Sequence, residues 1–195
     1  MVRKHPHFLI VLLLITIVTA TVFSVSGAPL TGTITPISVQ NISIHANEPA
    51  ISGDRIVWRD GNYNIHLYDI TTGIEQQLTP SVWGEEKPVI SGHYIAWQDD
   101  RYYDPDGYDI VLYDLDTDAG TRIAAGTGEQ TDPSIDDDLV VWQDTRNGVS
   151  DIYLYSISSE TETQVTSASG DQLYPRVSGD LVTWQDASDV INRIN

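Results

Sequence analysis

The sequence predicts an all-β fold built from repeated four-stranded antiparallel units. Three observations support this prediction. One pattern occurs four times, each copy divides into short apolar segments separated by turn residues, and no segment after residue 28 combines an apolar 3.6-residue period with helix caps. Strands and tight turns are therefore expected after residue 28, and helices are not.

The first 28 residues have the composition of an export signal. Arg3 and Lys4 precede an unbroken apolar run from Phe8 to Val25, and small residues follow at 26–28. This order is typical of a secretory signal peptide. Because the run approaches the ~20 residues that span a bilayer, an uncleaved membrane anchor is the alternative. In both cases the rest of the chain is expected outside the cytoplasm, secreted or at the cell surface.

A short linker is expected between this signal and the repeats. Residues 29–38 are rich in Thr and Pro and show no helical period, so the repeat region is expected to cover residues 39–195. Asn41 stands in an Asn-Ile-Ser triplet, which fits the N-glycosylation acceptor pattern. That pattern is short and has many chance matches.

Each of the four copies starts at a proline and reaches a tryptophan nine residues later. The pairs are Pro49 and Trp58, Pro88 and Trp97, Pro133 and Trp142, and Pro175 and Trp184. The starts are 39, 45 and 42 residues apart, and all the variation falls between the tryptophan and a tyrosine of the following segment. An insertion confined to one segment marks a surface loop on a fixed scaffold, so this segment is predicted to be a loop.

Each copy is predicted to form four strands, a to d. In the first copy strand a lies near Ala50–Ile51, a tight turn at 52–54 leads to strand b at Arg55–Trp58, and strands c and d follow at Ile65–Ile70 and Gln76–Thr79. The later copies repeat strand c at Ile110–Leu115 and Ile152–Ile157 and strand d at Arg122–Ala124 and Gln164–Thr166. Strand c is apolar on both faces, which requires cover on both sides. Four antiparallel strands per ~42 residues are typical of a β-propeller blade.

The repeat also resembles a known family. The pattern Pro-x-Ile-Ser-Gly-Asp-x-x-x-Trp-Gln-Asp, followed by Asp-Ile-Tyr-Leu-Tyr and a strand ending in Gln-x-Thr, is similar to the TolB-like propeller repeat in the form found in archaeal cell-surface, surface-layer-associated proteins. The resemblance covers Pro49 to about Asn195 and implies a propeller fold outside the cytoplasm. Two departures stand out: the commoner form has Ser-Pro-Asp-Gly at the first turn, and TolB-like propellers have six or more blades.

The blade count leaves two interpretations open. From Pro49 to Asn195 there are about 3.5 repeats, because the fourth copy keeps strands a and b and only a degraded strand c at Asp189–Arg193. Val39–His45 alternates in polarity and could supply an outer strand that closes a four-bladed ring. Alternatively that segment is the remnant of a preceding blade, and the chain is an incomplete propeller whose unpaired edges invite pairing with another chain. We favour the second interpretation.

The variable loops form the predicted binding face, because the b-to-c and d-to-a loops of a propeller share one face. The longest insertion is Asp99–Asp109. Tyrosines with small and charged neighbours supply contact area at low entropy cost. The candidate binding residues are Arg101, Tyr102, Tyr103, Tyr108 and, in a d-to-a loop, Trp83. The alternative is a solvated hairpin loop, with Trp83 covering its own blade.

Two aspartate clusters are candidates for calcium, the one cofactor ion that the sequence suggests. The first is formed by Asp104, Asp106 and Asp109, whose oxygen ligands suit a hard cation. The second, Asp114–Asp118, has alternating spacing but carries Ala119 where a calcium loop needs Gly and Ala125 where it needs Glu. It aligns with the turn at 71–73, so a plain c-to-d turn is the preferred interpretation.

The composition excludes several classes of function. The chain has 28 Asp and Glu against 10 Lys and Arg, and the resulting net charge of −18 argues against a nucleic-acid partner. The absence of cysteine rules out disulfides and thiolate metal sites. An apolar content of 41% is too high for a disordered acidic tail and predicts a packed core.

No catalytic residue is expected. A residue that recurs once per repeat is typically structural and accepts hydrogen bonds from a loop backbone, and one aspartate does so here. Its four copies are Asp60, Asp99, Asp144 and Asp186. His45, His66 and His93 show no metal-ligand spacing to one another, and the chain has no Gly-x-Ser-x-Gly elbow and no phosphate-binding glycine loop.

The sequence thus predicts a non-catalytic secreted or cell-surface module that binds a protein or a cell-envelope polymer through its loop face. Membrane contact is expected only through the N-terminal segment. Two alternatives remain: the propeller part of an extracytoplasmic hydrolase, peptidase or lyase, and a structural envelope component that cations stabilise against its own charge and that self-associates.

Overall fold

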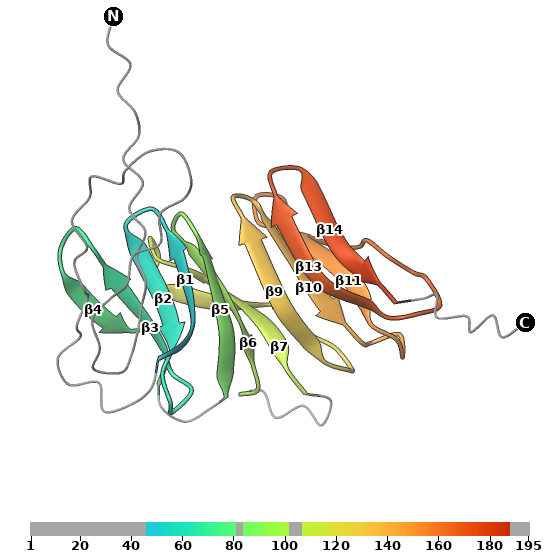
Figure 1. Cartoon of the computed structure of the whole chain (residues 1–195), viewed down its shortest axis with the longest axis horizontal. Helices are drawn as coiled ribbons and strands as arrows, with labels where there is room; N and C mark the ends of the chain where they lie inside the picture. Colours follow the sequence, from blue (N-terminus) through green and yellow to red (C-terminus); the bar gives the residue numbers. More distant parts are fainter. Residues whose placement is uncertain (1–45, 81–83, 102–106, 188–195) are drawn as a thin grey trace, which may run out of the picture. The chain divides into compact units, whose positions relative to one another are not determined.

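The computed structural model describes residues 46–80, 84–101 and 107–187 (Figure 1). The export signal, the linker and two segments on which the blade count depends, Val39–His45 and Asp189–Arg193, lie outside these residues. The elements assigned within the described ranges are all β-strands, which confirms the predicted all-β class. No helix in these ranges is long and apolar enough to cross a membrane.

The described strands form three four-stranded antiparallel sheets and one two-stranded sheet, here called blades 1 to 4. Blade 1 contains β1 (Asn47–Ser52), β2 (Arg55–Arg59), β3 (Ile65–Asp69) and β4 (Ile74–Gln77). Blade 2 contains β5 (Glu85–Ser91), β6 (Tyr94–Asp99), β7 (Asp109–Asp114) and β8 (Ala119–Ala124). Blade 3 contains β9 (Gln130–Asp136), β10 (Leu139–Asp144), β11 (Asp151–Ser156) and β12 (Thr161–Gln164). Blade 4 contains β13 (Gln172–Ser178) and β14 (Leu181–Asp186).

The a-to-b turns have the conformation that their sequence predicts. Gly53, Gly92 and Gly179 adopt φ values of 56°, 58° and 53°. Glycine reaches this left-handed region without the steric cost of a Cβ atom, which explains its place in the repeat. Blade 3 has Asp137 at this position with φ 46°, a conformation that aspartate tolerates better than most residues.

Strand d begins earlier than the sequence predicts. In blade 1 it starts at Ile74, directly after the c-to-d turn, and its assigned pairing ends at Gln77 rather than Thr79. The Gln-x-Thr motif instead closes the end of the blade with side chains. The Thr79 hydroxyl accepts a hydrogen bond of 2.9 Å from the Ile65 amide, and the Gln77 side chain donates to the Thr79 carbonyl at 2.6 Å. The same contacts recur in blade 3, where Thr166 accepts from Ile152 and Gln164 donates to Thr166.

The core lies between neighbouring blades, as predicted for a strand c that is apolar on both faces. One buried cluster joins blades 1 and 2, and a second joins blades 2 and 3. In β7, Val111 and Tyr113 belong to the first cluster, whereas Ile110 and Leu112 belong to the second. The alternation of side chains along a strand therefore sends successive residues to opposite blades.

Backbone bulges in strand a also connect the blades. Asp132 in β9 and Tyr174 in β13 have φ values of 54° and 55°, at positions where the strand register shifts. Their amides donate to the side-chain oxygens of Gln98 and Gln143 in the preceding blade, at 3.2 Å and 2.5 Å. The glutamine of the Trp-Gln-Asp pattern thus holds the next blade in place.

Blade 4 differs from the others in the exposure of its strand b. Trp184 is 41% exposed, whereas Trp97 and Trp142 are at most 1% exposed. Each of those two rings lies near a tyrosine of strand c, with ring centroids 6.0 Å and 6.2 Å apart. In the described residues β14 pairs only with β13, so its outer edge is open and Leu181 is 72% exposed.

Candidate functional site

The antiparallel strand order places the connections on two opposite ends of each blade (Figure 1). We call one end the loop face. Within the described residues it comprises the b-to-c segments 60–64, 100–101, 107–108 and 145–150 and the d-to-a segments 78–80, 84, 125–129 and 165–171. We call the other end the turn face, which comprises the a-to-b turns (53–54, 92–93, 137–138 and 179–180) and the c-to-d turns (70–73, 115–118 and 157–160).

The repeated aspartates are internal supports of the loop face. Asp99 accepts hydrogen bonds from the Trp97 indole at 2.8 Å and from the Arg101 backbone amide at 2.9 Å. In blade 3 Asp144 accepts from the Trp142 indole at 3.1 Å and from the Arg146 backbone amide at 3.0 Å. These contacts agree with the structural role inferred from their recurrence, because each carboxylate fixes the start of its own loop.

Blade 1 builds the same support with different donors. Asp60 accepts from the backbone amides of Asn62 and Asn64 at 2.8 Å and 2.9 Å and from the Asn64 side chain at 2.9 Å. Burial alone would raise the pKa of Asp60, but these hydrogen bonds and one from His66 outweigh it and lower the pKa below its usual value. Asp60 is therefore an anion that holds the loop. The Nε2 atom of His66 in β3 lies 3.2 Å from its Oδ2 atom.

Arg101, a predicted binding residue, is engaged at the base of its loop. Its Nε atom lies 2.9 Å and 2.8 Å from the two oxygens of Asp99. A terminal nitrogen lies 2.5 Å from Asp99 and 3.7 Å from Glu85. The guanidinium thus neutralises the buried Asp99 carboxylate and is partly exposed at its outer side. Four other predicted residues of this loop, Tyr102, Tyr103, Asp104 and Asp106, lie outside the described residues, as do Trp83 and Asn41.

One predicted calcium ligand, Asp109, is engaged in an ion pair inside blade 2. Asp109 is 1% exposed and accepts a hydrogen bond of 2.6 Å from the Arg122 guanidinium of β8. That ion pair joins strands c and d inside blade 2. Asp104 and Asp106 lie outside the described residues, so the calcium cluster that they would form with Asp109 stays a prediction.

Two tyrosines from neighbouring b-to-c connections lie on the loop face. Tyr108, which the sequence predicts, is half-buried, and burial together with the charges of Glu86 and Asp100 raises its pKa to about 12. Tyr63 also contributes to that shift, so the two phenols are close enough to interact. Tyr63 is 44% exposed, and the Arg59 guanidinium lies over its ring, 4.7 Å from the centroid. Its position in the first variable segment was the signal that sequence reasoning missed.

A buried acid pair lies beneath these loops. Glu85 begins β5 directly opposite Asp99, and both side chains are fully buried. Burial raises the pKa of Glu85, the Asp99 charge raises it further and Arg101 opposes the shift, which gives a value of about 8. In blades 3 and 4 the same position is Gln130 and Gln172, opposite the corresponding aspartates. A protonated Glu85 therefore stands where blades 3 and 4 have an amide.

An open cavity of about 540 Å³ lies on the turn face, where blades 1 and 2 meet. Its lining includes Ser52, Asp54, Arg55, Asp69, His93 and Asp116. The Arg55 guanidinium crosses between the blades and donates to the Gly92 carbonyl at 3.1 Å. The cavity is polar and negatively charged, which suits a cation or a cationic group more than an apolar ligand.

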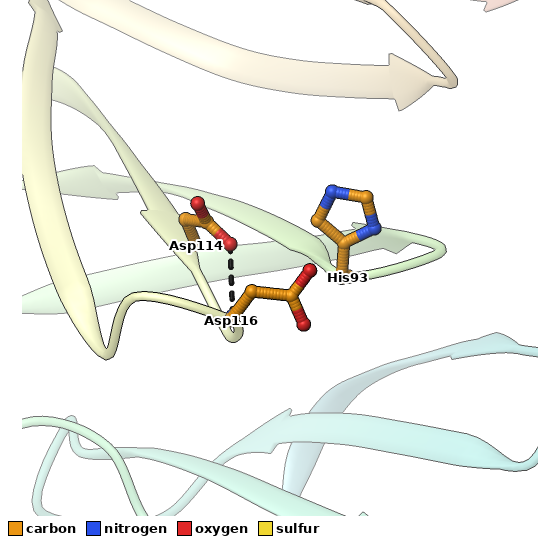
Figure 2. Close-up of side chains that lie close together, drawn as sticks. All are labelled: His93, Asp114 and Asp116. Carbon is orange, nitrogen blue, oxygen red and sulfur yellow. Dashed lines mark hydrogen bonds between the residues drawn. The ribbon is translucent and has the colours of Figure 1, made fainter.

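His93, Asp114 and Asp116 form a cluster beside this cavity (Figure 2). One ligand atom from each lies within 4.8 Å of the others, and the Asp116 amide donates to Asp114 at 2.9 Å. The two aspartates lie in the predicted c-to-d turn. The sequence prediction considered the spacing of His93 to the other histidines only. It missed that the neighbours of His93 are carboxylates of the facing c-to-d turn.

Comparisons with known proteins support the fold. No protein-family model matches the chain, and no curated protein matches it. Among solved structures, a candidate TolB from Agrobacterium tumefaciens matches 67% of this chain with 18% identity and a TM-score of 0.52. TolB from Acinetobacter baumannii matches 72% with 18% identity and a TM-score of 0.53, and the computationally designed Ika4 protein matches 75% with 12% identity and a TM-score of 0.55.

These similarities show a TolB-like β-propeller fold and no more, because the identities are low. The matched part spans 51% of the Agrobacterium TolB chain, 37% of the Acinetobacter chain and 88% of Ika4.

Proposed function

We propose that this chain is a non-catalytic propeller module of the cell envelope, which binds a protein or an envelope polymer through its loop face. The observation that carries the proposal is the pair of loop tyrosines, Tyr63 and Tyr108, held above a base of buried ion pairs. The export-signal composition of residues 1–28 and the TolB-like fold support a location outside the cytoplasm.

Tyr63 is exposed yet held in one orientation. Arg59 stacks on its ring, and the Arg59 Nε atom is itself 3.1 Å from the Glu48 carboxylate. A ring fixed before binding loses little conformational entropy when a partner covers it. Large aromatic side chains on such a rigid base are the usual anchors of protein and polymer recognition.

The polar groups of the loop face favour binding over catalysis. The recurring aspartates Asp60, Asp99 and Asp144 are all engaged in hydrogen bonds within their own loops. Arg101 and Arg146 are bound to the last two of these carboxylates. These side chains hold the loops, and the surface above them is free to vary between blades.

Binding of the full chain to an envelope fraction from the producing cells tests the proposal. We expect saturable co-sedimentation that Tyr63→Ala weakens by about tenfold, the effect of losing one aromatic anchor. Ile74→Ala is the matched control, because Ile74 is 63% exposed at the edge of the turn face. Equal binding by both variants would exclude the loop face as the binding surface.

We also propose that the open edge of β14 pairs with a second copy of the chain. Its support is the exposure of Leu181 and Trp184 on a strand whose counterparts in the other blades are paired on both edges. An unpaired edge is a template for strand addition. The stretch 172–186 carries only three of the chain's charged side chains, so two copies can meet there with little repulsion.

The native mass of the full chain tests this pairing. We expect a dimer that Val182→Pro converts to a monomer, because the Val182 amide points away from β13 and proline cannot donate to an added strand. A monomeric wild type whose Trp184 fluorescence is shielded from quencher would show instead that residues of the same chain cover the edge.

A further inference from the structure

In blade 3 side-chain hydrogen bonds join the a-to-b turn to the c-to-d turn on the turn face. Asp138 of the a-to-b turn accepts hydrogen bonds from the Ser156 hydroxyl at 2.8 Å and from the Ser158 amide and hydroxyl at 2.6 Å and 3.0 Å. The Ser156 and Ser158 hydrogen bonds lower the pKa of Asp138, so the contact is made to an anion. The Ile157 amide adds a backbone hydrogen bond to the Asp138 carbonyl at 2.8 Å.

Blade 2 keeps the backbone of this junction but replaces all three side chains. The Leu115 amide donates to the His93 carbonyl at 2.9 Å, as Ile157 does to Asp138. In the repeat alignment His93 takes the place of Asp138, and Asp114 and Asp116 take the places of the two serines. The hydrogen-bonding set of blade 3 has thus become one imidazole facing two carboxylates.

The three side chains at these positions in blade 2, His93, Asp114 and Asp116, are spaced as the ligands of one metal ion would be. Their ligand atoms lie within 4.8 Å of one another, yet in the described part of the chain no hydrogen bond or ion pair joins the imidazole to either carboxylate. Three atoms so spaced all lie within about 2.8 Å of one common point, and small side-chain rotations bring that distance to the 2.0–2.2 Å of zinc–nitrogen and zinc–oxygen bonds. Figure 2 shows the imidazole and the Asp116 carboxylate on the same side of the turn.

The donor set selects the class of ion. One imidazole nitrogen with two carboxylate oxygens suits zinc and its neighbours in the first transition row, whereas calcium prefers oxygen ligands alone. Two carboxylate charges balance a divalent cation. His93 and Asp116 also line the cavity shared with blade 1, whose wall carries Asp54 and Asp69, so the ion is reachable from solvent and its remaining coordination positions point to water.

We propose that His93, Asp114 and Asp116 bind one divalent metal ion of the zinc class, which joins the two turns of blade 2 as hydrogen bonds join those of blade 3. The site lies on the turn face, opposite the proposed binding surface. Its test therefore has an outcome independent of partner binding.

Zinc titration of the chelator-treated full chain by calorimetry, with thermal unfolding in parallel, tests the proposal. We expect one zinc per chain at this site and a rise in the unfolding midpoint with zinc concentration. His93→Ala should weaken binding at least about tenfold, because it removes the one nitrogen ligand. Calcium should produce a smaller shift than zinc, and an equal or larger calcium shift would overturn the assigned class.

The decisive control converts the junction of blade 2 into that of blade 3. The triple variant His93→Asp, Asp114→Ser, Asp116→Ser should fold with a metal-free midpoint near that of the wild type, because hydrogen bonds replace the ion. The triple variant should bind one zinc ion per chain fewer than the wild type. Because it keeps the histidines of residues 1–45, any zinc bound by those residues contributes equally to both proteins. Unchanged stoichiometry in this variant, or a wild-type midpoint that zinc does not move, would contradict the site.

Discussion

Replacing Glu85 with glutamine should make the protein more stable at neutral and alkaline pH. In the folded protein Glu85 keeps its proton up to a pKa of about 8, against 4.5 in the unfolded chain. Between these values the unfolded chain releases the proton and the folded protein does not, so the stability of the wild type falls as pH rises through this window. Below pH 4.5 the carboxyl is neutral in both states, and the contribution that is lost at higher pH is fully present.

The size of the effect follows from the window. One pKa unit corresponds to about 1.4 kcal/mol, so the wild type should lose on the order of 3 kcal/mol by pH 7 and somewhat more by pH 8, after which the loss levels off. A glutamine side chain at this position would have no proton to exchange. Gln130 and Gln172, which stand opposite Asp144 and Asp186, show that the repeat accommodates an amide here.

Urea unfolding at several pH values between 5 and 9, followed by tryptophan fluorescence, measures the difference. The free energy of unfolding of Glu85→Gln minus that of the wild type should grow with pH and reach a plateau above about 8. The reverse substitution, Gln130→Glu, creates the same acid pair in blade 3 and should introduce a new fall in stability over the same range. Parallel pH curves for the wild type and Glu85→Gln would refute the reasoning.

Two further predictions concern the blades themselves. Thr79→Val keeps the side-chain shape but leaves the buried Ile65 amide without its acceptor, so it should cost about 1–3 kcal/mol of unfolding free energy, whereas Thr121→Val on exposed β8 should cost little. A Thr79→Val protein with the urea midpoint of the wild type would show that another group accepts from this amide. Trp142→Ala should cost about 3–5 kcal/mol, and Trp184→Ala much less in a monomer, because only the first ring is buried. Equal losses measured at a concentration where the chain is monomeric would mean that Trp184 is covered within one chain.

The sequence predicts the blades well because each of their features repeats. The glycine turns, the strand b tryptophans and the double-sided strand c occur several times with fixed spacing, so chance matches are removed by comparison among copies. Strand d is the exception. Gln77 and Thr79 look like the last strand residues, but the structure uses their side chains to close the blade, and regular pairing starts earlier at Ile74.

The site residues that sequence reasoning missed are those that break the repeat. Glu85 matters because it faces Asp99 across a strand pair, and that register follows only from knowing where the bulge of β5 lies. His93 matters because the Leu115 amide donates a hydrogen bond to the His93 carbonyl. This contact holds the a-to-b turn of blade 2 against the c-to-d turn that carries Asp116. His93 stands where the other three copies have aspartate, and Glu85 stands where blades 3 and 4 have glutamine, so both differences were readable in the aligned repeats.

Hydrogen–deuterium exchange of the full chain, with and without saturating envelope fraction, tests the proposed binding function most directly. Backbone amides of the loop face should be protected, above all at residues 60–64 and 107–108 beside the two tyrosines. Those of the turn face at 53–54 and 70–73 should exchange at unchanged rates. Protection confined to the turn face, or none on the loop face under saturating conditions, would contradict the assignment of this propeller as a loop-face binding module.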